Sequence, residues 1–245
     1  MEPRDYALRV EQQPAGEATG DERFAGYAVI GLPFQSGHVL GLRRFPASSL
    51  GPAYTSIWHR DPAGDWVFIQ NVEPNQACSR YFGRALSESL VGEITIAWTG
   101  PRSLIVTCRG ERDVEWWIAL APTLASRLMN AIGNLVPERL WHSESFLRRM
   151  GSVAGRLLRA GRLTLVGQVP NGQRFLANPR LIWIVADSSA LLNGKDLGSI
   201  GRLPRQATLG EFRIPQRGIF GIVNAFMETF DPARHSAAPM KSEGS

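Results

Sequence analysis

The feature of this sequence that most constrains its fold is a close succession of strand-like segments joined by short turns. Apolar or alternating runs cover residues 24–34, 37–45, 53–60, 65–72, 92–98, 102–110 and 113–121. The connections include "QSG", "DPAGD" and "TGP", in which proline and glycine favour tight reversals of the chain. Consecutive strands separated by such turns are typical of an antiparallel barrel or sandwich.

The pattern changes between residues 122 and 160, where strand alternation is lost. Leu124, Leu128 and Ile132 recur at helical spacing, and Leu140, Leu147, Met150, Ala154 and Leu158 do the same further along. Pro122 and Pro137 suit the first turns of helices, and Gly161 suits a C-terminal cap. We therefore predict two helices in this stretch.

Strand signals return after the helices, over residues 162–169, 174–179, 180–194 and 206–214, and Pro170-Asn171-Gly172 predicts a hairpin turn. The sequence thus predicts a mainly β protein, an antiparallel β-barrel with a two-helix insertion at residues 122–160. We expect a single domain over residues 23–230, a mobile N-terminal segment at 1–22 and a disordered tail at 231–245.

Charge and cysteine content favour an ordinary globular protein without nucleic-acid or membrane partners. The net charge is +5, but only Lys195 and Lys241 are lysines and the arginines are spread along the chain, with no run longer than a pair. A generic basic surface explains this pattern better than a nucleic-acid site. There is no run of membrane-spanning length and no signal-like start. Two cysteines, Cys78 and Cys108, form no disulfide framework, so we expect a cytoplasmic protein.

Several chemistries find no support in the sequence. The four histidines lie far apart, and no His or Cys pair has the spacing of metal ligands, so no metal is expected. A phosphate-binding glycine loop and a serine nucleophile elbow are both missing. We therefore expect no metal and no nucleotide cofactor.

A few residues nevertheless point to chemistry. His59 is the best candidate for a general acid or base, with Tyr54 to polarise a carbonyl group. Arg80, Arg84 and Glu93 form a polar set in which arginine forks would suit a carboxylate. The aromatic rings of Trp98 and Trp116 would line a cavity. The plainer alternatives are that His59 is a surface histidine, that the polar set is a solvated rim and that the two tryptophans belong to a large core.

Cys78 is a second kind of candidate, because nearby arginines would lower the pKa of its thiol and make it a nucleophile. Free cysteines are more often small buried apolar groups. No histidine lies near Cys78 in the sequence, so we favour the buried alternative.

The order of segments resembles the acetoacetate decarboxylase-like superfamily. The resemblance rests on "RRFPASSLGPAYTSIW", "WVFIQNVEPNQACSRYFGRAL" and "LPRQATLGEFRIP", and covers residues 37–120 and 180–215. It implies a closed antiparallel β-barrel. The decarboxylases of that family form a Schiff base through a lysine that lies beside a second lysine.

This chain departs from that pattern at the decisive position. The corresponding segment, residues 79–87, has no lysine, and Arg84 cannot replace one because a guanidinium stays protonated. Tyr54 is followed by Thr55 and Ser56, where the family has a glutamate. Lys195 lies in a turn-like "NGKDLG" stretch. The sequence thus argues against Schiff-base decarboxylation. A lipocalin or calycin barrel is a competing resemblance, at the level of architecture alone.

Three functions remain open. The first is binding of a small, largely apolar and carboxylate-bearing molecule inside the barrel, anchored by Arg80 or Arg84. The second is a metal- and nucleotide-independent lyase, isomerase or cyclase of secondary metabolism that uses His59. The third is an interaction module, with a homo-oligomer formed through the helical insertion, which exposed Trp141, Phe146 and Met150 would favour.

Overall fold

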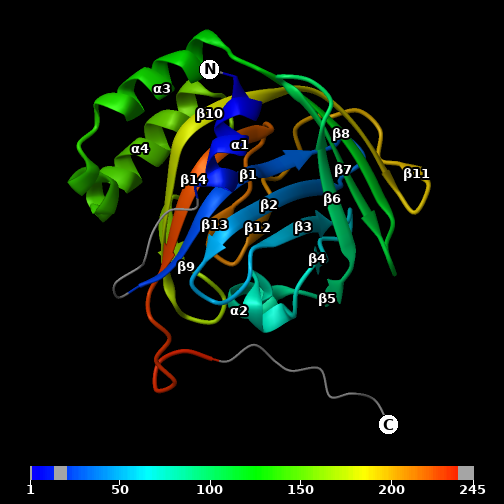
Figure 1. Ribbon diagram of the computed structural model, residues 1–245, viewed down its shortest axis with the longest axis horizontal. Coiled ribbons are helices and arrows are strands. Elements are labelled where there is room, and N and C mark those ends of the chain that lie inside the picture. Colours follow the sequence, from blue (N-terminus) through cyan, green and yellow to red (C-terminus); the bar gives the residue numbers. More distant parts are fainter. Residues whose placement is uncertain (1, 14–20, 237–245) are drawn as a thin grey trace.

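The computed structural model describes residues 2–13 and 21–236, and its main component is one large sheet (Figure 1). The strands are β1 (Glu22–Pro33), β2 (Val39–Ser48), β3 (Tyr54–Arg60), β4 (Trp66–Gln70), β5 (Glu88–Val91), β6 (Glu93–Trp98), β7 (Ser103–Arg109), β8 (Val114–Ala121), β9 (Val166–Gln168), β10 (Arg174–Leu192), β11 (Lys195–Asp196), β12 (Thr208–Leu209), β13 (Phe212–Arg213) and β14 (Ile219–Met227). The helices are α1 (Pro3–Gln12), α2 (Ser79–Phe82), α3 (Leu124–Leu135) and α4 (Glu144–Leu157), with short 3₁₀ turns at Pro74–Gln76, Gly83–Ala85 and Glu138–His142.

The sheet has the strand order β5-β4-β3-β2-β1-β14-β10-β8-β7-β6, and β9 and β11 also pair with β10. Strands β1 to β4 follow chain order, as the short turns between them predict. The last strand, β14, lies at the centre between β1 and β10. Two wings, β1–β4 and β6–β8, are therefore joined through β14 and β10.

The mainly β class is confirmed, but the sheet is not closed into a barrel. Strands β5 and β6 are its two edges, and no ladder joins them within the described residues. Gly92 alone connects them, and its N–H donates to Gln70 O of β4 at 2.9 Å. A single residue cannot form the hairpin that antiparallel neighbours need. The prediction of an all-antiparallel sheet is also wrong, because β4 and β5 are parallel.

The two wings enclose one large apolar cluster, which we call the inner cluster. Its members come from both wings and from α1, and include Tyr27, Val29, Leu42, Ile57, Ile69, Val106, Trp116, Ile118 and Phe220. Alternation along the strands places every second side chain here. The strands thus bury this face against one another.

The other side chains of β1–β4 form a second apolar layer, the outer cluster. It includes Phe24, Phe45, Tyr54, Trp58, Phe68, Tyr81, Phe82 and Phe175, and it packs under α2, the β12–β13 hairpin and the chain before β10. Segments distant in the sequence therefore cover this face.

The two predicted helices are confirmed as α3 and α4, which lie beside β10 and β14 (Figure 1). Thr123 caps α3 by accepting a hydrogen bond from the Ser126 N–H. Gly151 and Gly155 of α4 let the helix approach the chain at Leu163, because a Cβ at Gly151 would lie 2.7 Å from Leu163 O. Both helices are thus packed onto the sheet.

The described residues near both chain ends make hydrogen bonds. The N-terminal segment includes helix α1, whose Glu11 accepts two hydrogen bonds from Arg44 of β2, each 2.8 Å long. At the other end, the His235 N–H donates to Asp231 O at 2.8 Å. These are tertiary and capping contacts that composition does not reveal. Residues 14–20 and 237–245 lie outside the described part of the chain.

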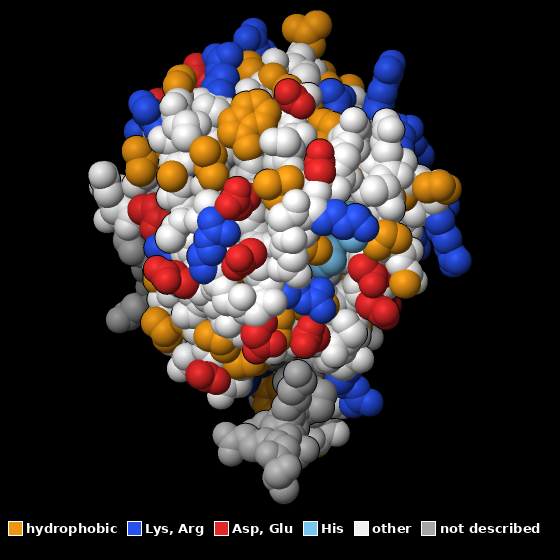
Figure 2. Space-filling view, turned by 90° about the vertical axis from the view of Figure 1, so that its right-hand side faces the viewer, with side chains coloured by type: hydrophobic (Ala, Val, Ile, Leu, Met, Phe, Trp, Pro, Cys, Tyr) orange, Lys and Arg blue, Asp and Glu red, His pale blue; other side chains and the backbone are white. Residues whose placement is uncertain are grey.

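The surface carries acidic and basic side chains interspersed over the face shown in Figure 2. In the described part of the chain, no helix combines the length and apolar character needed to cross a membrane.

Candidate functional site

A cavity of about 120 Å³ lies between the outer face of the sheet and the helices that cover it. Strands β1, β2, β3, β10 and β14 form its floor, and α2, α3, α4 and the β12–β13 hairpin form its walls. The lining is mostly apolar, with Phe24, Phe45, Trp58, Phe82, Phe212 and Met129 among its residues. We call it the Arg43 cavity, after the one guanidinium that is buried in its floor.

Arg43 is 6% exposed and lies on β2, where alternation points it away from the inner cluster. Its Nη1 donates to Val29 O at 2.6 Å and to Leu42 O at 2.9 Å, and its Nη2 donates to Ile30 O at 3.0 Å. Val29 and Ile30 lie at a shift in the β1–β2 register, which frees their carbonyl groups from the ladder. Arg43 therefore stabilises this irregularity in the sheet.

These bonds leave part of the guanidinium unused. Arginine has five N–H donors, and the three bonds occupy both hydrogens of Nη1 and one of Nη2. The remaining donors are on Nε and Nη2, the side of the group that binds a carboxylate with two parallel bonds. Among the described residues, no carboxylate pairs with Arg43 within 4 Å.

Burial lowers the pKa of Arg43 to about 10, while Cys78 and Tyr54 oppose this change. The side chain thus remains charged at neutral pH, in apolar surroundings. Its Cζ lies 4.1 Å from the ring centroid of Trp58, a cation–π contact that partly compensates for lost hydration.

Two further polar groups lie beside Arg43 in the cavity lining. The Tyr54 hydroxyl is 3.2 Å from Cys78 Sγ. The indole N–H of Trp58 is buried near Cys78 and makes no hydrogen bond of normal geometry within the described structure. The cavity therefore combines an apolar body with donors from Arg43, Trp58 and Tyr54.

Cys78 is buried, and this burial raises the pKa of its thiol, although Tyr54, Arg43 and Trp58 act in the opposite direction. Burial also raises the pKa of Tyr54 well above its usual value. Both groups are thus neutral at physiological pH. The thiol is not poised as a nucleophile, as the buried alternative predicted.

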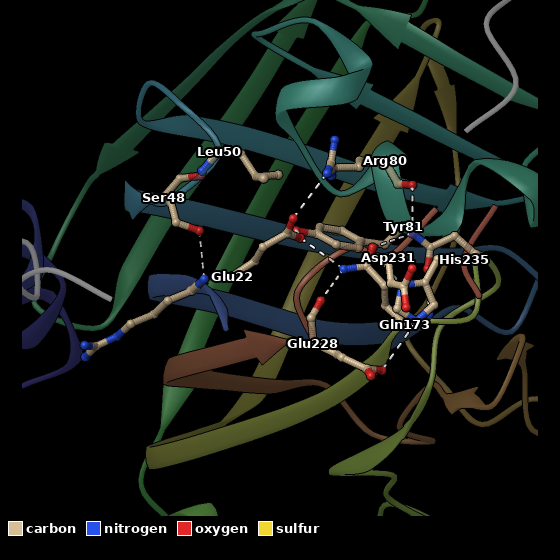
Figure 3. A network of polar contacts seen from close by, with 12 residues as sticks. Glu22, Ser48, Leu50, Arg80, Tyr81, Gln173, Glu228, Asp231 and His235 are labelled. Atoms are coloured by element: carbon tan, nitrogen blue, oxygen red, sulfur yellow. Dashed lines mark hydrogen bonds and ion pairs between the residues drawn. The ribbon is translucent and has the colours of Figure 1, made fainter. Parts of the chain in front are cut away.

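A polar network includes Tyr81 of α2, which also lines the cavity (Figure 3). The carboxylate of Glu22, at the start of β1, accepts hydrogen bonds from Tyr81 Oη at 2.5 Å, Arg80 Nη2 at 3.2 Å and Gln173 Nε2 at 3.2 Å. Gln173 also donates to Glu228 O. The network joins α2, β1 and the chain segments just before β10 and just after β14. It holds α2 in place over the sheet.

The polar set predicted from the sequence is not brought together. Arg80 pairs with Glu22 and stacks on Phe230, with 5.3 Å between Arg80 Cζ and the ring centroid. Arg84 is exposed in the turn after α2, and Glu93 is exposed on the edge strand β6. None of the three lines the Arg43 cavity. The sequence spacing of Arg80, Arg84 and Glu93 does not show that Glu93, which follows Gly92, begins the other edge strand of the sheet.

His59 and Tyr54 lie on opposite faces of β3, because they are five positions apart and side chains alternate between the faces of a strand. His59 is 1% exposed, and its Nε2 lies 3.0 Å from Nδ1 of His38. Burial, followed by His38 and Arg112, lowers the pKa of His59 to about 4. The structure therefore does not bring the His59 and Tyr54 side chains together, and His59 does not line the Arg43 cavity.

The two predicted ring walls belong to the inner cluster. Trp116 is fully buried and its Nε1 donates to Ser188 Oγ at 2.9 Å. Trp98 packs edge-on against Phe220 with ring centroids 5.8 Å apart. Both fill the apolar interior between the wings.

The sequence contained a signal for Arg43 that the spacing of motifs did not use. Along β2, Val39, Gly41, Arg43 and Phe45 share one face, and Arg43 is its only charged member. A charged residue at the centre of an otherwise apolar strand face indicates a buried ionic group, and such a group needs hydrogen-bond or charge partners to offset its lost hydration.

The described lining of the cavity includes no lysine, and Lys195 is exposed at the β10–β11 turn. A Schiff base therefore has no amine in this site, whereas Lys241 lies outside the described residues. Within residues 2–13 and 21–236, no group of three or more histidine, cysteine, aspartate and glutamate side chains is arranged to hold a metal ion.

Comparisons with known proteins give only distant similarity. No family model and no curated protein matches the chain. The chain is similar to an acetoacetate decarboxylase structure from Legionella pneumophila, with 11% identity and a TM-score of 0.40 over 89% of this chain and 90% of that one. A second acetoacetate decarboxylase structure has 11% identity and a TM-score of 0.39 over 86% and 88%. Neither of these two structures is a lipocalin or calycin.

Proposed function

We propose that this protein binds a small carboxylic acid with a compact apolar body in the Arg43 cavity. The observation that carries the proposal is a buried guanidinium with two free donors and no carboxylate partner among the described residues. Burial of an unpaired charge is costly, and an anionic ligand offsets that cost. The ligand carboxylate would accept from Nε and Nη2 of Arg43, with Trp58 and Tyr54 beside it.

The size of the cavity limits the ligand. A dry apolar cavity of about 150 Å³ accommodates benzene, so a space of about 120 Å³ suits a body of a few carbon atoms. Branched or planar short-chain acids fit this description better than long fatty acids. The aromatic lining would supply contact area to the apolar body.

The chemical class agrees with the ligand expected from the sequence, but the anchor differs. Arg80 is engaged by Glu22, and Arg84 faces solvent. Arg43 is the buried guanidinium of the cavity lining, whereas Arg180 and Arg213, which also line it, are partly exposed.

A cofactor-independent lyase, isomerase or cyclase remains an untested alternative. Its predicted base, His59, lies on the inner face of β3 and is hydrogen-bonded to His38. If the cavity supports a reaction, the groups available at its floor are Arg43 and Tyr54, with Tyr54 as a neutral donor. No described contact favours this alternative over binding.

Isothermal titration of the purified protein with matched acids and amides tests the proposal. The pairs are benzoate with benzamide and isovalerate with isovaleramide, which differ in charge and little in shape. We expect at least one acid to bind about tenfold more tightly than its amide, because a charge-assisted bidentate pair contributes about 1.4 kcal/mol or more. If no acid exceeds its amide, the proposal is wrong.

Two variants and one control locate the binding. Arg43→Met should abolish the preference for the acid, and Ala177→Leu should weaken both members of a pair by filling the cavity. The Ala177→Leu variant keeps Arg43 and its hydrogen bonds to the β1–β2 register shift. It therefore still tests the location of the ligand if Arg43→Met does not fold. Arg84→Ala should bind like the wild type. Acid binding that survives Ala177→Leu unchanged would place the ligand elsewhere.

A further inference from the structure

A second hollow, separate from the Arg43 cavity, lies where the chain after α4 meets the segment before β14. It has a volume of about 500 Å³ and an apolar floor of Leu32, Val185 and Ile200. Three arginines, Arg159, Arg202 and Arg217, line it, and its lining includes no acidic residue. We call it the arginine groove.

The tertiary structure concentrates positive charge here. Residues 156–162 contain Arg156, Arg159 and Arg162, and residues 202–217 contain Arg202, Arg205, Arg213 and Arg217 with one acidic residue, Glu211. The two segments are joined by hydrogen bonds from Gln216 N to Ala160 O at 2.7 Å and from Arg162 N to Gln206 Oε1 at 3.1 Å. Two basic segments that are distant in the sequence thus lie side by side, and Arg159, Arg202 and Arg217 from them line the groove.

The three groove arginines have a structural role that leaves most of their donors free. Arg202 Nη2 donates to Arg159 O, and Arg217 Nη1 donates to Leu158 O at 3.5 Å, so both approach the C-terminal carbonyl groups of α4. Each bond uses one of five N–H donors. All three residues are exposed, and none forms an ion pair with a carboxylate in the described part of the chain.

The backbone of Arg159 has an uncommon conformation. Its φ is 54°, in the left-handed region where a helix end normally has glycine. A residue with a side chain is disfavoured there, and such positions occur preferentially at functional sites. The conformation holds a charged side chain at the groove.

We propose that the arginine groove binds a small phosphorylated organic molecule. Its phosphate would accept hydrogen bonds from Arg159, Arg202 and Arg217, and its apolar part would lie on Leu32, Val185 and Ile200. Guanidinium forks match phosphate oxygens in geometry and charge. The volume of about 500 Å³ lies within the range of sites for small molecules.

The shape of the groove favours a small molecule over nucleic acid. Nucleic-acid surfaces follow a backbone with repeated phosphate contacts along a stripe or face. Here the three arginines surround one concavity with an apolar floor. The site is independent of the Arg43 cavity, so it extends the function beyond the acid binding proposed above.

Isothermal titration of the full-length protein with phenyl phosphate and with inorganic phosphate tests this proposal. We expect phenyl phosphate to bind more tightly, because only its ring reaches the apolar floor. Arg202→Ala and Arg217→Ala should each weaken phenyl phosphate binding about tenfold. Arg159→Gly should weaken it similarly and should keep the unfolding temperature, because glycine adopts a positive φ without strain.

Arg149→Ala is the matched control, since Arg149 is an exposed residue of α4 that does not line the groove. It should change the affinity less than twofold. Equal losses in Arg149→Ala and in the groove variants would overturn the proposal, because they would show a general charge effect. Absence of saturable binding of phenyl phosphate to the wild type would overturn it as well.

A 20-base-pair DNA duplex serves as the competing ligand. If the duplex binds more tightly than phenyl phosphate and with the same dependence on Arg202 and Arg217, the surface is a nucleic-acid site and the small-molecule proposal is wrong. If the duplex does not displace phenyl phosphate, the proposal is supported.

Discussion

The two faces of strands β1–β3 are built from alternate residues of the same short segments, yet they differ in kind. The inner face, with Leu42 and Ile57, is filled by apolar side chains from both wings of the sheet. The outer face, with Arg43 and Tyr54, retains a cavity of about 120 Å³. Side chains that are adjacent in the sequence therefore have different roles, because one set fills the core and the other lines the cavity.

The difference comes from what covers each face. The inner side chains meet strands of the same sheet, whose regular spacing allows them to interdigitate. The outer face is covered by α2, α3, α4 and the β12–β13 hairpin, which reach it from four parts of the chain. Helices and loops do not match the period of a strand surface, so space remains between them.

The largest effect that would test this comparison is the loss of an inner-face side chain. Trp116→Ala removes a fully buried ring and its hydrogen bond to Ser188, so it should lower the free energy of unfolding by about 3–5 kcal/mol. Acid binding by the fraction that remains folded should not change. Urea unfolding measures the free energy of unfolding, and isothermal titration calorimetry measures the acid affinity. A loss below about 1 kcal/mol would show that the inner face is not the main core.

A pH-dependent effect of roughly 3 kcal/mol should also arise on the inner face. The pKa of His59 falls from 6.5 in the unfolded chain to about 4 in the folded protein, through burial, His38 and Arg112, with Asp61 opposing. The folded state then binds fewer protons below pH 6.5, so stability is full above that pH and is lost as the pH falls towards 4.

Urea unfolding at pH 7.5 and pH 4.5 measures this dependence. The variant His59→Gln should reduce the difference between the two pH values, whereas His142→Gln, at an exposed position, should keep it. An unchanged difference in His59→Gln would contradict the assignment of this stability to His59.

A matched pair of substitutions compares the packing of the two faces directly. Ala190→Leu overfills the inner cluster and should cost about 1–3 kcal/mol of stability. Ala177→Leu points into the Arg43 cavity and should cost less than about 1 kcal/mol, because space is present there. Equal costs in chemical denaturation would show that the outer face is packed as tightly as the inner one.

The smallest effects are expected at the residues that the sequence pattern favoured. Arg84→Ala and Glu93→Gln change exposed side chains outside both cavities, so stability should shift by less than about 0.5 kcal/mol. Acid affinity should equal that of the wild type by titration. A clear loss of binding in either variant would move the ligand site to the rim of the sheet.

Much of the fold followed from local pattern. The strands β1 to β4 and β6 to β8, the two helices within residues 122–160 and the turn at Pro170-Asn171-Gly172 were predictable, because period and turn chemistry are properties of short segments, whereas the short parallel strand β5 was not predicted. Strand β14 was missed. Its "IFGIVNAFM" run does not alternate, since a central strand is covered on both faces.

The candidate site was less predictable, for a physical reason. Tyr54 lines the cavity, whereas His59, Arg84 and Glu93, which closeness in sequence grouped with it, do not. Strand alternation separated His59 from Tyr54, and the connection at Gly92 carried Glu93 to the other edge of the sheet. Arg43 was overlooked because its role depends on the β1–β2 register shift.

By itself, the sequence determined a mainly β protein with a helical insertion, because hydrophobic period and turn residues act within a few positions of one another. The tertiary structure alone decided that the sheet remains open at β5 and β6 and that the cavity lies on its outer face. It also decided that three arginines from two segments, Arg159, Arg202 and Arg217, line one groove. Closure, cavities and charge clusters depend on contacts between distant segments, and local patterns do not encode those contacts.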